Sequence, residues 1–129
     1  MTHVSLVTKC FVIASNKKVL ILKRTDTAKI RPGMWDLPGG MVDDKENPNI
    51  AIIREIKEET TIETDRPRVI FVATELLPAY IITLFYKSDY NRGAVEIGPE
   101  HTGYRWIDMN EFLNLDLPEK FKQAAAFLQ

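Results

Sequence analysis

The stretch GMVDDKENPNIAIIREIKEETTI, from Gly40 to Ile62, decides the fold. Asn47 followed by Pro48 is a helix start signal, because asparagine caps a helix N-terminus and proline fits the first helical turn. Four apolar residues then recur at helical spacing: Ala51, Ile52, Ile53 and Ile56. The stretch therefore predicts a helix from about Pro48 to about Thr60.

Three glutamates, Glu55, Glu58 and Glu59, fall within an arc of roughly 100° on the predicted helix. Like charges at these spacings each destabilise a helix by about 0.2–0.5 kcal/mol. The last two also lie in the final turn, where the helix dipole disfavours anions. A hard divalent cation offsets both effects, since Mg²⁺ is bound by carboxylate oxygens, waters and substrate phosphates. Three glutamates alone leave a solvated acidic face open as the alternative.

The flanking sequence predicts a mixed α/β architecture. Residues 3–24 contain two β-rich runs around a polar turn and are expected to form a hairpin, while residues 25–40 lose all periodicity and are expected to form a long loop. Further strands are expected over residues 69–77, 79–86 and 104–107, and helices over 108–113 and 119–128. Strands on both sides of one central helix favour a mixed β-sheet with helices on both faces.

Length and charge restrict the class of protein. The chain has 129 residues, 17 Lys and Arg against 18 Asp and Glu, and a net charge of −1. This length predicts one domain over residues 1–129. Because the chain lacks a bulk positive field, we expect no stable nucleic-acid binding and no membrane association. The single cysteine, Cys10, is interpreted as a buried strand residue. Without a signal-peptide pattern at the N-terminus, a cytoplasmic location is expected.

Residues 40–62 resemble the box of the Nudix hydrolase family, which reads G, five residues, E, seven residues, then REUxEExGU, where U is a bulky aliphatic residue. Eight of the nine fixed positions match: Gly40, Glu46, Arg54, Glu55, Ile56, Glu58, Glu59 and Ile62. The lead-in WDLPGG, residues 35–40, is also similar to the family's. The resemblance implies the Nudix α/β/α sandwich, a mixed sheet with helices on both faces.

One position departs from the family pattern. The glycine near the helix end is replaced by Thr61, and a β-branched residue with positive φ is strained by roughly 1 kcal/mol or more. We therefore expect the chain to leave this helix by a different turn, with the carboxylates retained.

The resemblance also implies roles for the matching residues. Mg²⁺ or Mn²⁺ would be held by three carboxylates and one backbone carbonyl: Glu55, Glu58, Glu59 and Gly40. Glu46 and Arg54 would orient the carboxylates. A metal-activated water would then attack a diphosphate in line, without a covalent protein nucleophile.

The general base is predicted from a later loop. Glu100 in the sequence GPEH is the expected candidate, with Glu58 or Glu59 as alternatives and Glu96 as a weaker one. His101 titrates in a suitable range but is interpreted as a loop histidine without a catalytic role.

Four residues are expected to contact substrate: Lys23, Arg24, Trp35 and Tyr80. Lys23 and Arg24 end the second strand beside the long loop, where they either meet phosphate or are solvated, and Lys29 and Arg31 share this ambiguity. Trp35 and Tyr80 either stack on a base or pack in the core.

The expected function is metal-dependent hydrolysis of a nucleoside diphosphate linked to another group. A (d)NTP pyrophosphohydrolase of the MutT-like branch, giving NMP and pyrophosphate, is the first hypothesis. ADP-ribose, a nucleotide sugar or a dinucleoside polyphosphate is the alternative substrate class, and a non-catalytic nucleotide-binding module is the alternative function. The expected partner is a small nucleotide, and the chain is expected to be a monomer or a homodimer.

Overall fold

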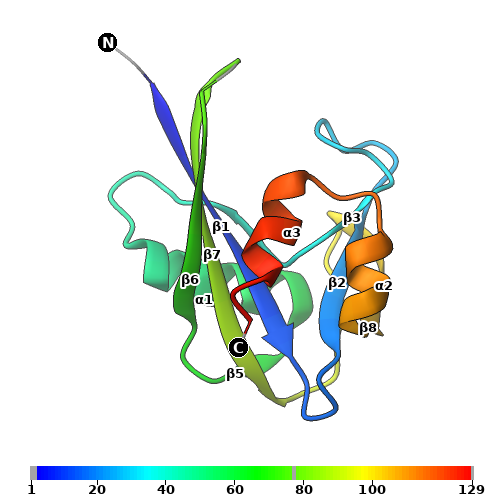
Figure 1. Cartoon of the computed structure of the whole chain (residues 1–129). Helices are drawn as coiled ribbons and strands as arrows, with labels where there is room; N and C mark the ends of the chain where they lie inside the picture. The colour runs from blue at the N-terminus through cyan, green and yellow to red at the C-terminus, as the bar shows by residue number, and fades with distance from the viewer. Residues whose placement is uncertain (1–2, 77, 129) are drawn as a thin grey trace.

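The computed structural model describes residues 3–76 and 78–128. Its strands are β1 (Val4–Ile13), β2 (Val19–Arg24), β3 (Trp35–Asp36), β4 (Gly39–Met41), β5 (Glu63–Thr64), β6 (Arg68–Glu75), β7 (Tyr80–Arg92) and β8 (His101–Ile107). Its helices are α1 (Pro48–Thr60), α2 (Met109–Asn114) and α3 (Glu119–Ala125). Figure 1 shows α1 behind the sheet, with α2 and α3 in front of it.

The sheet is mixed and has two halves. In one half, β1 pairs in parallel with β7 and antiparallel with β4, and β7 also pairs with β6 and β5. In the other half, β2 pairs antiparallel with β3 and β8. The halves meet at the pair Ile13↔Val19. The hairpin expected over residues 3–24 is therefore paired only next to its turn. Beyond this pair, β1 and β2 separate (Figure 1).

The segment expected to be a long loop carries two short strands. β3 pairs with β2, and β4 pairs with β1, so residues 35–41 connect the separated halves. The backbone N–H of Cys10 also donates to the carbonyl of Pro38 between these strands, at 2.8 Å. Strands of two and three residues are too short for a periodic signal, which is why the expectation of a loop without strands was wrong here.

Side-chain alternation along the central strands builds a core on each face. Phe11 and Ile21 face the core formed with α2 and α3, whereas Cys10, Val12 and Leu20 face the core formed with α1. Successive strand residues point to opposite faces, so a fully buried strand reads as an unbroken apolar run. The predicted mixed sheet with helices on both faces is confirmed, as is the burial of Cys10.

Helix α1 begins and ends where the sequence predicts, with the Asn47 side chain accepting from the N–H of Asn49. The expected change of turn at Thr61 was wrong. Thr61 adopts the left-handed conformation, with φ 62°, that a glycine adopts at this position. Its hydroxyl donates to the carbonyl of Ala94 at 3.1 Å, and Lys57 Nζ donates to its carbonyl at 3.3 Å. These hydrogen bonds hold the strained backbone in place.

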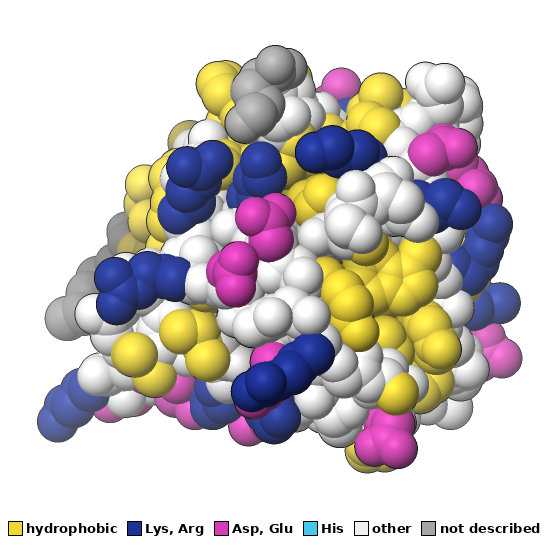
Figure 2. Space-filling model, turned by 90° about the horizontal axis from the view of Figure 1, so that it is seen from below, with side chains coloured by type: hydrophobic (Ala, Val, Ile, Leu, Met, Phe, Trp, Pro, Cys, Tyr) yellow, Lys and Arg dark blue, Asp and Glu magenta, His cyan; other side chains and the backbone are white. Residues whose placement is uncertain are grey.

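Several boundaries differ from the sequence-based expectations. Strand β7 continues to Arg92, β8 begins at His101, α3 ends at Ala125, and β5 was not expected. Position 77, the expected end of one strand, lies outside the described residues. Across residues 3–76 and 78–128, no helix combines the length and the apolar character that crossing a bilayer requires. Lys and Arg side chains are interspersed with Asp and Glu on the face in Figure 2, consistent with the balanced charge.

Candidate active site

A cavity of about 880 Å³ opens between α1, the end of β2 and α3. One wall is acidic and comes from α1, and the facing wall is cationic and comes from β1, β2 and the loop between β2 and β3. The acidic wall holds Glu55, Glu58 and Glu59, and the cationic wall holds Lys9, Arg24 and Arg31. The cavity therefore has two ends of opposite charge.

The three glutamates of α1 lie in different environments. Glu58 is exposed, Glu55 is partly buried, and Glu59 is only 8% exposed. Burial raises the pKa of Glu59 to about 8, against the opposing effect of a hydrogen bond from the backbone N–H of Gly39 at 2.9 Å. Burial also raises the pKa of Glu55, and the nearby Arg54 partly counteracts that shift. The wall thus combines one solvated carboxylate with one that is held in place by the backbone.

The two glycines that precede this wall permit a close approach of backbone and carboxylate. Gly39 has φ 143°, and a Cβ there would lie 2.0 Å from the carbonyl oxygen of Thr8. A Cβ on Gly40 would lie 2.8 Å from the carboxyl group of Glu55. The Gly40 carbonyl accepts a hydrogen bond from Thr8 Oγ1 at 3.1 Å. Only glycine fits at Gly39 without a shift of backbone, because the contact there is with main-chain atoms.

Arg54 connects the carboxylates of the wall. Its guanidinium binds Glu46 through two hydrogen bonds, Nε to Oε2 at 2.8 Å and NH2 to Oε1 at 3.0 Å. Its NH1 group donates to Glu55 at 3.1 Å and to Glu58 at 3.2 Å. The hydrogen bond from Arg54 holds the pKa of Glu46 below its usual range. A planar guanidinium with several donors is suited to orienting carboxylates in this way.

The loop after β7 brings one further carboxylate to the cavity. Glu100 lines the cavity, and its charge contributes to raising the pKa of Glu55. Glu96 is exposed and does not line it; its backbone N–H donates to Thr60 at the end of α1, at 3.0 Å. The structure therefore brings Glu100, and not Glu96, to the acidic wall.

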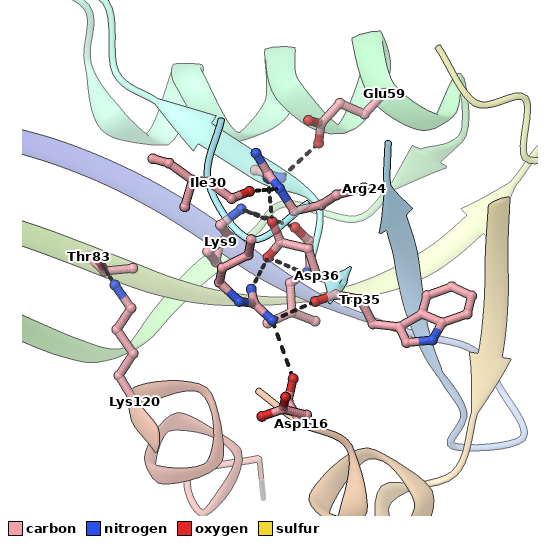
Figure 3. Close-up of polar contacts among 12 residues, drawn as sticks. Lys9, Arg24, Ile30, Trp35, Asp36, Glu59, Thr83, Asp116 and Lys120 are labelled. Atoms are coloured by element: carbon pink, nitrogen blue, oxygen red, sulfur yellow. Dashed lines mark hydrogen bonds and ion pairs between the residues drawn. The ribbon is translucent and has the colours of Figure 1, made fainter. Parts of the chain in front are cut away.

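The cationic wall is organised by Asp36, whose side chain is only 4% exposed. Lys9 Nζ and Arg24 NH1 each lie 2.9 Å from Asp36 Oδ2, and Arg31 NH1 lies 4.0 Å from Oδ1. Figure 3 shows Lys9 and Arg24 converging on Asp36, below Glu59 of α1. Burial alone would raise the pKa of Asp36, but these cations outweigh it and lower the pKa. Three cations sharing one carboxylate leave this wall with net positive charge.

Only one of the four residues expected to contact substrate lines the cavity. Arg24 lines the cavity, whereas Lys23, Trp35 and Tyr80 do not. The Trp35 ring points away from the Asp36 cluster in Figure 3. It packs against the core, with Lys23 Nζ 6.0 Å from its centroid. Of the two ambiguous loop cations, Arg31 lines the cavity and Lys29 does not.

Comparison with known proteins identifies the family. A family model described as the NUDIX domain matches residues 5–128. The chain belongs to the Nudix family. Like its relatives, it is therefore a pyrophosphohydrolase that acts on phosphorus-containing anhydrides.

Two curated relatives and one solved structure illustrate the Nudix likeness. A Bacillus subtilis protein named "Putative 8-oxo-dGTP diphosphatase" is 31% identical over 91% of this chain and 76% of its own length. The asymmetrical bis(5'-nucleosyl)-tetraphosphatase of Mus musculus is 33% identical over 74% of this chain and 67% of its own. A MutT protein from Methanosarcina mazei superimposes with a TM-score of 0.85 at 25% identity, covering 95% of this chain and 91% of that one.

Nudix hydrolases generally need a divalent metal, and the donor set of the acidic wall fits one. Within residues 3–76 and 78–128, no three His, Cys, Asp or Glu side chains converge into a ready metal site. Mg²⁺ does not need such a cage, because it is usually bound by one or two carboxylates, waters and substrate phosphates. The hard oxygen donors of Glu55, Glu58 and Glu59 share one cavity wall. Gly40 lies beside them, and the absence of a side chain there leaves room for the Glu55 carboxyl group.

The cationic wall contains residues that sequence reasoning missed. Lys9 and Asp36 were not singled out, and neither was Lys120 of α3, which lines the cavity and donates to Glu75 and Thr83. A signal existed in the sequence, since Lys9 interrupts an apolar strand and Asp36 stands between Trp35 and Leu37. Charged residues inside apolar runs are rarely buried unless they are paired.

Proposed function

We propose that this Nudix hydrolase is a divalent-metal-dependent nucleoside triphosphate pyrophosphohydrolase that releases a nucleoside monophosphate and pyrophosphate. The observation that carries the proposal is the pairing of an acidic wall with a cationic wall across one cavity. A polyphosphate chain can interact with both walls at once, through bound metal at the carboxylates and directly at Lys9, Arg24 and Arg31. The name of the Bacillus subtilis relative supports the same substrate class.

In this reaction, a water oxygen forms a bond to phosphorus and the P–O–P bridge to the departing pyrophosphate breaks. Mg²⁺ or Mn²⁺ would be held by Glu55, Glu58, Glu59 and the Gly40 carbonyl, and would supply charge neutralisation and acidify a bound water. Arg54 and Glu46 hold the carboxylates in position through their hydrogen bonds. Glu100 stands at the rim of the cavity as the candidate that accepts the water's proton.

Glu59 has a different position from the other candidates for the base. Its hydrogen bond with the Gly39 N–H and its burial fix its orientation. A fixed carboxylate suits a metal ligand, whereas the exposed Glu100 can reorient toward a water. We therefore assign Glu59 to the metal set and Glu100 to proton transfer.

The products test the proposal directly. The enzyme with Mg²⁺ is offered nucleoside triphosphates, ADP-ribose, nucleotide sugars and dinucleoside polyphosphates, and both products are identified. Release of free pyrophosphate with a monophosphate supports the proposal, because only a triphosphate can yield pyrophosphate from one cut. Glu58→Gln and Glu59→Gln are expected to lose activity by 10²-fold or more, on the order expected for loss of an electrostatic catalytic group. Glu96→Gln, outside the cavity, is the matched control.

A dinucleoside polyphosphate is the second candidate substrate. The name of the mouse relative favours it, and the cavity of about 880 Å³ lies within the range that holds a sizeable ligand. A single cut in such a substrate leaves a nucleoside on each product. Turnover in the panel without any free pyrophosphate would therefore favour this candidate or ADP-ribose over a triphosphate.

A further inference from the structure

His101 differs from every other polar side chain in the described part of the molecule. Its Nδ1 atom is the one buried side-chain nitrogen or oxygen without a hydrogen-bond partner among the described residues. The residue is only 7% exposed, yet it lines the cavity. The sequence-based interpretation as a loop histidine was wrong, because His101 is the first residue of β8. An unpaired buried polar atom is unfavourable and calls for an explanation.

The proton on the ring can be assigned from this environment. A neutral imidazole carries one proton, on either Nδ1 or Nε2. A proton on Nδ1 would be a buried N–H without an acceptor, which native structures avoid more strictly than an unpaired lone pair. The proton therefore belongs on Nε2. Nδ1 is enclosed and His101 lines the cavity, so we take Nε2 as the ring nitrogen that can meet a ligand.

The neighbours of His101 include two cationic hydrogen-bond donors. His101 lies opposite Arg24 in the β8–β2 register, so their side chains share one face of the sheet. Lys9 and Arg24 both act on the pKa of His101, and burial, the largest effect, lowers that pKa and favours the neutral ring. Two carboxylates, Asp36 and Glu100, act on the same pKa in the opposite direction to burial. Glu100 is exposed. Asp36 is already used, since Oδ2 accepts from Lys9 and Arg24 and Oδ1 accepts from the N–H of Leu37.

This part of the cavity thus has more donors than acceptors. Lys9 donates to Asp36 and to the carbonyl of Leu37, and Arg24 donates to Asp36 and to the carbonyl of Ile30. Lys9 has three N–H groups and Arg24 has five, so donors remain on both. A ligand that satisfies them must bring acceptor oxygens, and the net positive charge of the wall favours an anionic one.

We propose that the Nε2–H group of His101, together with the remaining donors of Lys9 and Arg24, binds a phosphoryl oxygen of the substrate. This role rests on the proposed function, which supplies the polyphosphate. His101 is then a substrate-binding residue on the wall opposite the metal-binding carboxylates. It contributes a neutral donor, which adds direction to the attraction that the two cations supply.

The first test needs no variant, because the chain has only two histidines, His3 and His101. Long-range ¹H–¹⁵N correlation spectra of the wild-type protein report which ring nitrogen carries the proton. We expect the Nε2–H form at His101, and a saturable shift of its Nε2 resonance when inorganic pyrophosphate is added without metal. His3, which is exposed, is expected not to move. An Nδ1–H form, or a His101 signal that stays unchanged through the whole titration, would overturn the proposal.

Variants test the same contact by affinity. His101→Leu removes the donor and is expected to weaken pyrophosphate binding by about tenfold, which corresponds to about 1.4 kcal/mol. His101→Gln can place an amide N–H near the position of Nε2 and is expected to bind within about threefold of wild type. His3→Gln is the matched control. Wild-type affinity in the leucine variant would refute the contact.

Turnover separates this inference from the proposed function. With any substrate that the enzyme cleaves, His101→Leu is expected to raise KM more than it lowers kcat, whereas a purely structural role would lower the melting temperature and kcat with little effect on KM. Pyrophosphate binding at His101 in a protein that does not cleave triphosphates would refute the substrate assignment alone. Cleavage of triphosphates with an unchanged KM in the leucine variant would refute the role of His101 alone.

Discussion

Thr61 shows how a single residue can keep a backbone conformation that its side chain disfavours. A left-handed conformation costs a residue other than glycine roughly 1–2 kcal/mol. At Thr61 the cost is offset by three hydrogen bonds. The Thr61 N–H donates to the Lys57 carbonyl, and the Thr61 hydroxyl donates to the Ala94 carbonyl. Lys57 Nζ donates to the Thr61 carbonyl. The contact with Ala94 also ties the end of α1 to the chain after β7.

This balance predicts that two substitutions at Thr61 change stability by different amounts. Thr61→Ala keeps the strained φ and loses the hydroxyl contact, so it is expected to destabilise the protein by about 1 kcal/mol. Thr61→Gly loses the same contact but relieves the strain, so its stability is expected to stay within about 0.5 kcal/mol of wild type. Urea denaturation of both variants measures the difference. Equal destabilisation by alanine and glycine would show that the strain is negligible.

The raised pKa of Glu59 makes the stability of the metal-free protein depend on pH, which can be measured with a chelator present. Its pKa in the folded protein is about 8, well above the unfolded value of about 4.3. The folded state then binds the proton more tightly than the unfolded state. The contribution of Glu59 to the free energy of unfolding is therefore fully present below about pH 4 and is lost as the pH rises toward 8. Between about pH 5 and pH 9 the melting temperature of wild type is expected to fall relative to that of Glu59→Gln.

The glutamine variant keeps the acceptor for the Gly39 N–H but cannot ionise, which makes this comparison specific. Glu96→Gln, an exposed substitution, is expected to follow wild type over the same range. Parallel melting curves for wild type and Glu59→Gln at all pH values would mean that Glu59 is ionised in the folded protein without metal.

At the scale of elements, Asp36 joins strands that the fold would otherwise leave apart. β1 and β2 separate beyond their turn, and Asp36 in β3 binds Lys9 from the first and Arg24 from the second. The same ion pairs hold three cations on one side of the cavity. The structural role of β3 and the charge of the cationic wall therefore depend on the same carboxylate.

Removing this carboxylate is expected to be costly. Asp36→Asn leaves Lys9, Arg24 and Arg31 without their shared counter-ion and is expected to destabilise the protein by about 3–5 kcal/mol at neutral pH. Because the pKa of Asp36 is lowered in the folded protein, its contribution is present above about pH 4 and is lost as the pH falls further. Urea denaturation at neutral and acidic pH measures both effects.

The exposed Asp44→Asn is the control for this prediction and is expected to change stability by less than about 0.5 kcal/mol. If Asp36→Asn destabilised the protein no more than this control at neutral pH, the ion pairs would have no net stabilising effect. The free energy of unfolding of the asparagine variant is also expected to fall less than that of wild type as the pH drops below about 4.

The elements also show what the sequence could and could not predict. The predicted bounds of helix α1, about Pro48 to about Thr60, are confirmed, because Asn47, Pro48 and the apolar spacing are local signals. The strands β3 and β4 were missed, because they exist only through pairing with β2 and β1. The acidic wall followed from the resemblance of one contiguous motif. Of the cationic wall, Arg24 was predicted and Arg31 was left ambiguous, and both line the cavity. Lys9 and Asp36 were missed, because only the tertiary fold brings these distant segments together.

At the scale of the whole molecule, the sheet carries two cores and places the cavity where its halves diverge. Opposite charges face each other there although the chain as a whole carries a net charge of only −1. The separation of charge is therefore local to the site. The oligomeric state and the cytoplasmic location stay predictions from the sequence.

Metal binding is expected to stabilise the whole fold, because only the folded protein brings Glu55, Glu58 and Glu59 to one cavity wall. A ligand that binds only the folded state adds about 1.4 kcal/mol for each tenfold rise in concentration above its Kd. For a chain of this length that corresponds to roughly 4–7 °C in melting temperature. Thermal unfolding at neutral pH across a Mg²⁺ titration, repeated with Mn²⁺, measures the effect.

The rise is expected to shrink in Glu58→Gln and Glu59→Gln and to persist in Glu96→Gln, which lies outside the cavity. Glu58 is exposed and makes its described contacts with Arg54. Glu58→Gln should therefore weaken metal binding with little change in the stability of the metal-free protein. A Mg²⁺ titration that stabilised Glu58→Gln and wild type equally would place the metal elsewhere, and the assignment of the acidic wall would have to be abandoned.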